Sequence, residues 1–272
     1  MNFPTTELSS RLASLSRASV KSFIFCTSFI QPERRSASAA KWRKWIRYYE
    51  GRKDLFGAER ILLIDDGTPL EDIRLKVNLI NADRRLPDEL PKGTVMFRFE
   101  KHLGRSSTFC FPGWWRSFTF SYEVAKKYSF DKIIHFEADA FVVSPLMARY
   151  IRNLRRGWTA FWCPRYNFPE VAVQIICRDA FQDMEAFYSD GKIFWSQSAA
   201  AFPPALPEHA LPFTNINKEF VGNRYGEYRD TIPKRAAYAT QTLLTMNVSD
   251  RLTPPGEHRN KRPRRPLRCR VS

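Results

Sequence analysis

The sequence predicts an α/β protein whose central sheet is mostly parallel and flanked by helices, and three observations support this class. Segments of strand character alternate with segments of helical periodicity. The expected strands are continuous apolar runs, as at residues 60–64, and such runs are typical of strands buried on both faces. The chain has 272 residues, of which 43% are hydrophobic, so it can build a large core and is not a disordered protein.

The expected strands are apolar runs bounded by turn residues. The second of them, for example, is followed by Asp65-Asp66-Gly67. Two late strands flank a turn at residues 164–169. In chain order, the expected strands cover residues 20–30, 60–64, 95–99, 132–143, 157–163 and 171–177.

Helices are expected where apolar residues recur at helical spacing. The first has one apolar stripe with Arg and Lys opposite, and is expected to run to a C-cap at Gly57. A second covers residues 115–128, and a third follows the N-cap pair Ser144-Pro145. Residues 234–244 are expected to form a closing helix. The stripe of the first helix consists of Trp42, Trp45, Ile46, Tyr49 and Phe56.

Much of the net charge of +16 lies at the C-terminal end. Residues 251–272 contain eight Lys or Arg, one Glu and four prolines, which predicts an extended, disordered tail. We therefore expect a flexible arm over residues 1–19, a single globular domain over 20–250, and this basic tail. The tail is expected to have electrostatic affinity for polyanions, and two partners stay open: nucleic acid, and peripheral contact with an anionic membrane. No helix-turn-helix or RNP pattern indicates specific nucleic-acid binding.

Cysteine usage and the lack of long apolar runs indicate the compartment. The five cysteines are widely spaced and include no C-x-x-C pair, which argues against a disulfide framework and a zinc site. No run approaches the roughly 18–20 apolar residues of a membrane span, and no secretory cleavage pattern follows an apolar segment. We therefore expect a cytoplasmic protein, with its tail at the inner face of a membrane.

The most informative segment is the apolar run at residues 132–143, because it contains two carboxylates, Glu137 and Asp139. On a strand these side chains share a face, roughly 6–7 Å apart at about 3.3 Å per residue. Carboxylates held that close repel each other unless a cation or a proton lies between them. A divalent metal is the cation we expect. The competing interpretation is that Asp139 pairs with a neighbouring Arg or Lys.

Four features follow one another along the chain: an N-terminal strand, a second strand ending in Asp65-Asp66-Gly67, a Gly104-Arg105 loop leading to a helix, and the Glu137-Ala138-Asp139 element. In this order they resemble the GT-A fold of nucleotide-sugar glycosyltransferases, over roughly residues 20–180. The resemblance implies an enzyme that moves a sugar from a nucleotide-diphosphate donor to a glycan or glycolipid acceptor.

The resemblance also implies roles for particular residues. Asp139 and Glu137 would bind Mn²⁺ or Mg²⁺ against the donor diphosphate, and Asp139 is the safer ligand because the family usually has Asp where Glu137 stands. Asp65 and Asp66 would meet the base or ribose of the nucleotide sugar. The competing interpretation of these two is ordinary turn chemistry, in which Asp bonds its own backbone.

Arginines and further acids complete the expected site. Arg105 and Arg116 belong to the loop-to-helix element of the resemblance, which implies that they contact the diphosphate, since a guanidinium fork matches phosphate oxygens. The competing interpretation is that each is a solvated surface group. An inverting transferase also needs a general base near the acceptor hydroxyl. The candidates are Glu170, Asp179, Glu208 and Glu219, which the sequence does not rank, and His209 is the only candidate for a histidine ligand late in the domain.

Two other function classes remain open at this point. A nucleotidyltransferase uses a similar sheet and metal-binding carboxylates, but it usually has a glycine-rich loop after the first strand. Residues 27–40 contain no glycine, which favours the glycosyltransferase. The non-enzymatic alternative is a basic protein that binds polyanions through its tail.

Overall fold

The computed structural model of the chain describes residues 20–105, 111–163, 168–186, 189, 211–223 and 238–241. The expected arm at residues 1–19 and the expected tail at 251–272 lie outside these residues, so both stay predictions. Within the described part, no helix is long and apolar enough to cross a membrane.

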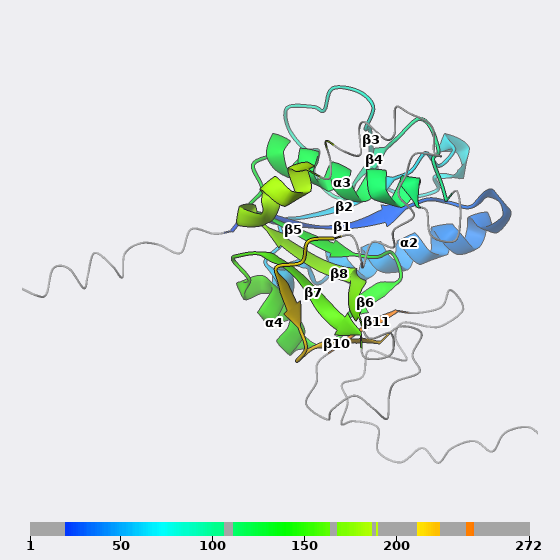
Figure 1. The fold of residues 1–272 in the computed structure, drawn as a ribbon. Helices are drawn as coiled ribbons and strands as arrows, with labels where there is room; N and C mark the ends of the chain where they lie inside the picture. Colours follow the sequence, from blue (N-terminus) through cyan, green and yellow to red (C-terminus); the bar gives the residue numbers. More distant parts are fainter. Residues whose placement is uncertain are drawn as a thin grey trace, which may run out of the picture.

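The centre of the molecule is an eight-stranded sheet with the order β3-β4-β2-β1-β5-β8-β7-β9 (Figure 1). Strand β8 runs antiparallel to its neighbours β5 and β7, whereas the other neighbouring pairs are parallel. The expected mostly parallel α/β class is therefore confirmed. The strands are β1 (Ser22–Ser28), β2 (Arg60–Asp65), β3 (Asn78–Asn81), β4 (Val95–Arg98), β5 (Lys132–Phe136), β7 (Trp158–Cys163), β8 (Phe168–Cys177) and β9 (Asn215–Asn217).

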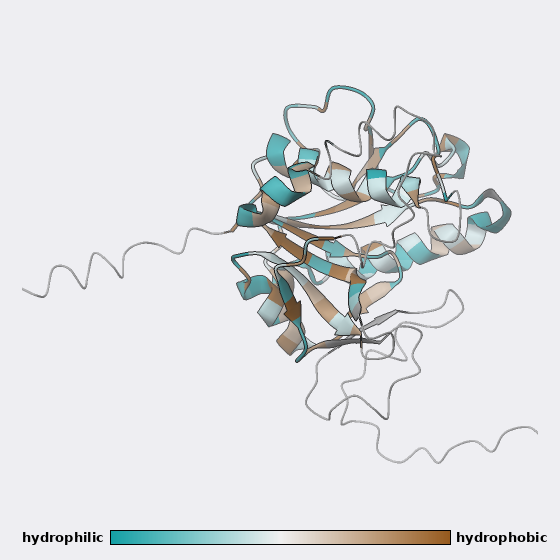
Figure 2. Ribbon diagram, viewed as in Figure 1, coloured by the Kyte–Doolittle hydropathy of each residue, from teal (hydrophilic) through white to brown (hydrophobic). Residues whose placement is uncertain are grey.

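Helices cover both faces of this sheet, because the strands are apolar on both sides (Figure 2). Along β1, Ile24 and Cys26 belong to the core on one face, and Phe23 and Phe25 to the core on the other. Helix α2 (Arg35–Glu50) packs on the first core and α3 (Pro112–Lys127) on the second. Figure 1 shows the two helices on opposite sides of β1 and β2.

The chain changes direction across the sheet at β1. From β1 it passes through α2 to β2 and on toward β4, and it returns through α3 to β5 on the other side of β1. Strand β1 is therefore bonded in parallel to β2 and to β5. In open α/β sheets, ligands bind beyond the carboxyl ends of the strands at such a reversal point.

The single strand expected at residues 132–143 is wrong, because the chain turns in its middle. Strand β5 ends at Phe136, and the backbone N–H of Ala140 donates to the carbonyl of Glu137 at 2.8 Å, which closes a turn. Strand β6 (Ala140–Val142) then joins a separate three-stranded sheet with β10 (Val221–Asn223) and β11 (Tyr238–Gln241). Glu137 and Asp139 thus lie in a turn and do not share a strand face.

The closing helix expected at residues 234–244 is also wrong over its described part. Residues 238–241 form β11, which pairs antiparallel with β6 from Ala239 opposite Val142 to Gln241 opposite Ala140. The local periodicity favoured a helix, but backbone pairing with a strand more than ninety residues away determines the conformation. Strand β3 was not expected, because its short segment has polar Asn residues at both ends.

The first helix is shorter than its apolar stripe suggested. Helix α2 ends at Glu50, and Phe56 lies in a separate 3₁₀ turn, η2 (Lys53–Phe56), where it still packs against Tyr49 at 5.9 Å between ring centroids. Gly57 ends η2 with a φ of 71°, a left-handed conformation that glycine adopts without strain. Ser144 caps α4 (Pro145–Asn153) as expected, its hydroxyl accepting from the Met147 N–H at 3.3 Å.

Helix α2 is joined to β6 by two tyrosine hydroxyls. Tyr48 donates to the Val142 carbonyl at 2.7 Å, and Tyr49 donates to the Ala140 carbonyl at 2.9 Å. The Val142 N–H in turn donates to the Tyr49 hydroxyl at 3.2 Å. Both rings are buried, so water cannot replace these hydrogen bonds.

Replacing Tyr49 with Phe should therefore destabilise the protein by about 1–3 kcal/mol, because two buried backbone groups lose their partner. Urea unfolding followed by circular dichroism measures the change. Tyr150→Phe is the matched control, since that hydroxyl accepts an exposed hydrogen bond from Asn215 at 3.2 Å. Equal stability of Tyr49→Phe and the wild type would show that the Tyr49 hydroxyl does not stabilise the contact between α2 and β6.

His135 on β5 is a core residue, fully buried among Phe25, Trp114 and Phe118. Burial lowers the pKa of His135 to about 3, below its usual 6.5. Between these values the unfolded chain binds a proton that the folded chain excludes. The free energy of unfolding should therefore fall as pH drops below 6.5, by up to about 1.4 kcal/mol per pH unit.

A His135→Leu variant should lose this part of the pH dependence while keeping an apolar side chain in the core. The comparison is made by urea unfolding of both proteins between pH 7 and pH 4. Parallel pH profiles for the two proteins would show that His135 does not titrate differently in the folded and unfolded chains.

Candidate functional site

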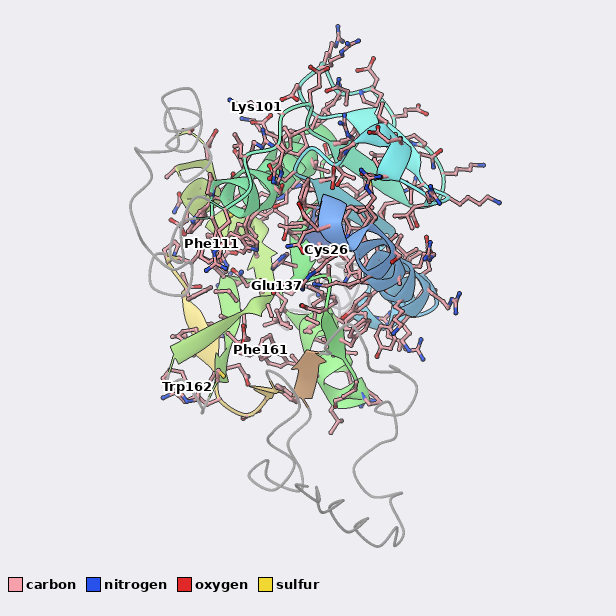
Figure 3. The ribbon with its side chains drawn as sticks, turned by 90° about the vertical axis from the view of Figure 1, so that its right-hand side faces the viewer. Cys26, Lys101, Phe111, Glu137, Phe161 and Trp162 are labelled. Atoms are coloured by element: carbon pink, nitrogen blue, oxygen red, sulfur yellow. The ribbon has the colours of Figure 1, made fainter. Side chains whose placement is uncertain are left out.

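The site lies at the edge of the large sheet where the parallel strands end. Figure 3 views this edge, with Cys26 of β1 and Glu137 after β5 labelled near its centre. The parallel strands β1, β2, β4 and β5 end here at Ser28, Asp65, Arg98 and Phe136. The reversal point between β1 and β5 therefore carries the Glu137–Asp139 segment, which we call the acidic turn.

The acidic turn is held to the sheet on one side and to α2 on the other. The Glu137 N–H donates to the Ala172 carbonyl of β8 at 2.9 Å, and Ala138 is buried. The Asp139 carboxylate accepts a hydrogen bond from the Lys41 ammonium of α2, with 2.8 Å between Nζ and Oδ2. Asp139 thus pairs with a basic residue, as the competing interpretation of the sequence had it.

Charged groups at this edge shift the pKa values of their neighbours. Burial lowers the pKa of Lys41, but the negative groups around it, with Asp139 first, together raise it more, so the net pKa lies above the usual value. Burial raises the pKa of the Cys26 thiol well above its usual range, opposed by Lys41 and assisted by Asp139. Cys26 is therefore a neutral core residue, and Lys41 is a permanent cation.

The oxygen ligands of the acidic turn suit a hard divalent cation such as Mg²⁺, which is often held by one or two carboxylates together with substrate phosphates. In the described part of the chain, no cluster of three or more His, Cys, Asp or Glu side chains could hold a metal by itself. The donor set therefore fits a cation that shares its coordination with a bound phosphate. It also has one positive charge already in place, that of Lys41.

Asp65 at the end of β2 is engaged in its own turn. Its carboxylate accepts from the Thr68 N–H at 2.8 Å and from the Thr68 hydroxyl at 2.7 Å, and Ser28 donates to it at 3.4 Å. Burial raises the pKa of Asp65 to about 6, although the bonds from Thr68 oppose the rise. These contacts are the ordinary turn chemistry considered above, and nucleotide contact by Asp65 stays a prediction.

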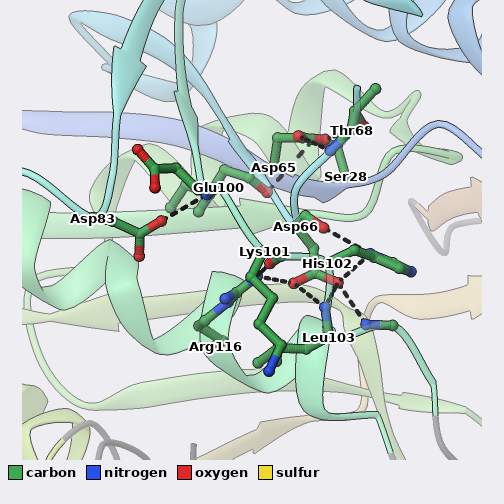
Figure 4. A network of polar contacts seen from close by, with 12 residues as sticks. Ser28, Asp65, Asp66, Thr68, Asp83, Glu100, Lys101, His102, Leu103 and Arg116 are labelled. Atoms are coloured by element: carbon green, nitrogen blue, oxygen red, sulfur yellow. Dashed lines mark hydrogen bonds and ion pairs between the residues drawn. The ribbon is translucent and has the colours of Figure 1, made fainter. Parts of the chain in front are cut away.

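Asp66 is the centre of a buried polar network (Figure 4). Its carboxylate accepts from the Gly104 N–H at 2.8 Å and from the guanidinium of Arg116 on α3. The His102 ring lies 2.9 Å from the same carboxylate. Arg116 also donates to the Lys101 carbonyl and lies over the Phe99 ring at 3.9 Å. Asp66 therefore joins the turn after β2, the 101–104 loop and α3.

Two glycines allow this network to close. Gly67 has a φ of 83°, and a Cβ there would lie 2.7 Å from the His102 backbone nitrogen. A Cβ on Gly113 would lie 2.0 Å from a carboxylate oxygen of Asp66. Both distances are shorter than real Cβ atoms make. Glycine is therefore required at position 67 for the turn to lie against the His102 backbone, and at position 113 for the start of α3 to lie against Asp66.

The arginines expected at the diphosphate are placed differently from each other. The Arg116 guanidinium is buried against Asp66, which the sequence did not indicate because the partners are fifty residues apart. The exposed Arg105 lies at the end of the 101–104 loop, with its guanidinium 4.6 Å from the Phe111 ring centroid. Diphosphate contact by either stays a prediction.

Two candidates for the general base, Glu170 and Asp179, lie at opposite ends of β8. This strand is antiparallel to β5 and pairs Val173 with Phe136, the last residue of β5. Glu170 therefore lies at the same sheet edge as the acidic turn, buried, with its carboxylate accepting from the Ala172 N–H at 3.1 Å. Asp179, beyond the other end of β8, accepts from the Gly157 N–H at 2.8 Å at the opposite edge. Glu219 precedes β10, and Glu208 and His209 lie outside the described residues.

Lys41 is the site residue that sequence reasoning missed. Its spacing held a signal, since Lys41 precedes Tyr48 by seven residues, or two helical turns. It therefore lies on the face of α2 that meets β6. The fold and this edge define an α/β protein with a cation-paired acidic turn at the reversal point of its sheet.

Comparison with known proteins gives little beyond this class. No protein-family model matches the chain, and no curated protein matches it. Among solved structures, it is similar to a glycosyltransferase involved in the glycosylation of the major capsid of PBCV-1, with a TM-score of 0.42 and 11% identity over 84% of this chain and 96% of that one. At this level of similarity, the function has to be argued from the chain's own residues.

The Asp66–Arg116 pair should be required for folding. Replacing Arg116 with Met leaves the Asp66 carboxylate buried without its guanidinium, and should cost about 3–5 kcal/mol of stability. Urea unfolding measures the loss. The control is Arg84→Met, which removes an exposed partner of Glu100 and should change stability by less than about 1 kcal/mol. Similar small losses in both variants would contradict a structural role for Arg116.

Proposed function

We propose that the chain is a glycosyltransferase that moves a sugar from a nucleotide-diphosphate donor to a glycan or glycolipid acceptor, with Mn²⁺ or Mg²⁺ as cofactor. The observation that supports this most is the acidic turn at the reversal point between β1 and β5. Nucleotide ligands of open α/β sheets bind at such points. Carboxylates there repel a diphosphate unless cations accompany it, so the position favours a cation-assisted phosphate site.

The chemistry requires positive charge beside the departing diphosphate. A divalent cation, when bound, would be held by Asp139 and Glu137 and would neutralise the charge that develops there. Arg105, on the loop leading to α3, is the arginine whose exposure suits phosphate contact. Arg116 would act indirectly, by holding the 101–104 loop against Asp66.

The two ends of the donor would lie on either side of the acidic turn. The Asp65–Asp66 turn follows β2, next to β1, and suits the nucleoside end of the donor. Glu170 lies beyond β5 on β8, at the same edge, and is the base candidate closest in the sheet to the acidic turn. We therefore propose Glu170 as the residue that accepts the proton of the acceptor hydroxyl.

Ligand binding can be tested by thermal shift with UDP-, GDP- and CMP-sugars, each with and without Mn²⁺. A ligand at 100 times its Kd stabilises the folded state by about 2.7 kcal/mol, so the correct donor should raise Tm by several degrees. Asp139→Asn should lose the Mn²⁺-dependent part of the rise. Glu59→Gln, an exposed acid at the opposite edge of the sheet, is the matched control.

Two outcomes would contradict the proposal. One is that no nucleotide sugar shifts the wild type, and the other is that Asp139→Asn responds as the wild type does. Nucleoside triphosphates belong in the same screen, since stabilisation by a triphosphate and not by its sugar derivative would favour the nucleotidyltransferase.

A further inference from the structure

The pairing of Lys41 with Asp139 has a consequence for any metal at the acidic turn. The two side chains meet at 2.8 Å and are 29% and 30% exposed, so the pair lies at the surface of the site and a ligand can reach it. A divalent cation held by the same carboxylate would place its charge close to the Lys41 ammonium. The ammonium and the metal would then compete for the Asp139 carboxylate.

The fold holds Lys41 in this position. The side chains of Trp42 and Trp45 on α2 are buried in the core, and the hydroxyls of Tyr48 and Tyr49 bond to the backbone of β6, directly after the acidic turn. The backbone of Lys41 is therefore fixed relative to Asp139. Its four-carbon side chain remains flexible enough to move the ammonium away.

We propose that Lys41 is the resident cation of the acidic turn, and that a divalent ion binds Asp139 only by displacing it. This inference rests on the proposed function only in taking the acidic turn as a cation site. An ammonium close to the coordination position repels a doubly charged ion strongly, because screening is weak at a half-buried site. The free protein should therefore bind divalent metal weakly.

The displaced ammonium has a use once the donor is bound. Lysine is a point charge that binds phosphate oxygens well. With a diphosphate and a divalent cation bound, Lys41 would exchange its carboxylate partner for a phosphate oxygen, and the Asp139 carboxylate would be available to hold the cation. Lys41 is then a donor-binding residue, and the site holds its full positive charge only with the diphosphate present.

The test is a titration of the nucleotide-free protein with Mn²⁺, in which electron paramagnetic resonance measures the concentration of free Mn²⁺ at each step. Removal of the ammonium in Lys41→Met should lower the Kd for Mn²⁺ roughly tenfold or more relative to the wild type. Lys41→Arg keeps the charge and should bind as weakly as the wild type. Arg47→Met removes an exposed charge from the same helix and should also leave the Kd unchanged.

The added affinity must come from Asp139, so the double variant Lys41→Met with Asp139→Asn should lose it. Circular dichroism establishes that each variant is folded, and Lys41→Gln, with the same expected gain, replaces Lys41→Met if the latter does not fold. Equal or weaker Mn²⁺ binding by the folded Lys41 variant would overturn the inference. Because no nucleotide sugar is present, this result is independent of whether the protein transfers sugar.

Discussion

Strand β1 is bonded in parallel on both sides, and the position of the site depends on this constraint. Because β2 and β5 both lie beside it, the chain must leave β1 in one direction through α2 and come back in the other through α3. The two helices then cover opposite faces, and the carboxyl ends of β1 and β5 meet where neither connection crosses. The middle of β1, from Phe23 to Cys26, is apolar on both sides, which is what a strand in this position requires.

Two carboxylate–cation pairs at this edge differ in burial. The buried pair stabilises the fold, and the partly exposed pair is available to a ligand. Asp66 and Arg116 are both buried, so the pair joins a turn, a loop and a helix, and the two charges satisfy each other inside the protein. Asp139 and Lys41 are both partly exposed. Their charges remain within reach of a phosphate or a metal. The acidic turn is therefore the part of the edge that can exchange partners.

Much of this could be predicted from local sequence. The buried strands β1, β2, β4 and β5 are apolar runs, and Ser144-Pro145 marks the start of α4. Glu137 and Asp139 were identifiable as carboxylates in an apolar segment. What could not be predicted depends on partners distant in the chain. Lys41 meets Asp139 across 98 residues, and β11 is a strand because β6 pairs with it.

The central claim is that the acidic turn binds the diphosphate of a nucleotide sugar together with a divalent ion. A crystal structure of the protein soaked with a UDP- or GDP-sugar and Mn²⁺ tests it most directly, with manganese located by its anomalous signal. We expect manganese bonded to the Asp139 carboxylate and to diphosphate oxygens, beyond the ends of β1 and β5, with the Lys41 ammonium moved to a phosphate. A diphosphate bound elsewhere, with the Lys41–Asp139 pair intact, would contradict it.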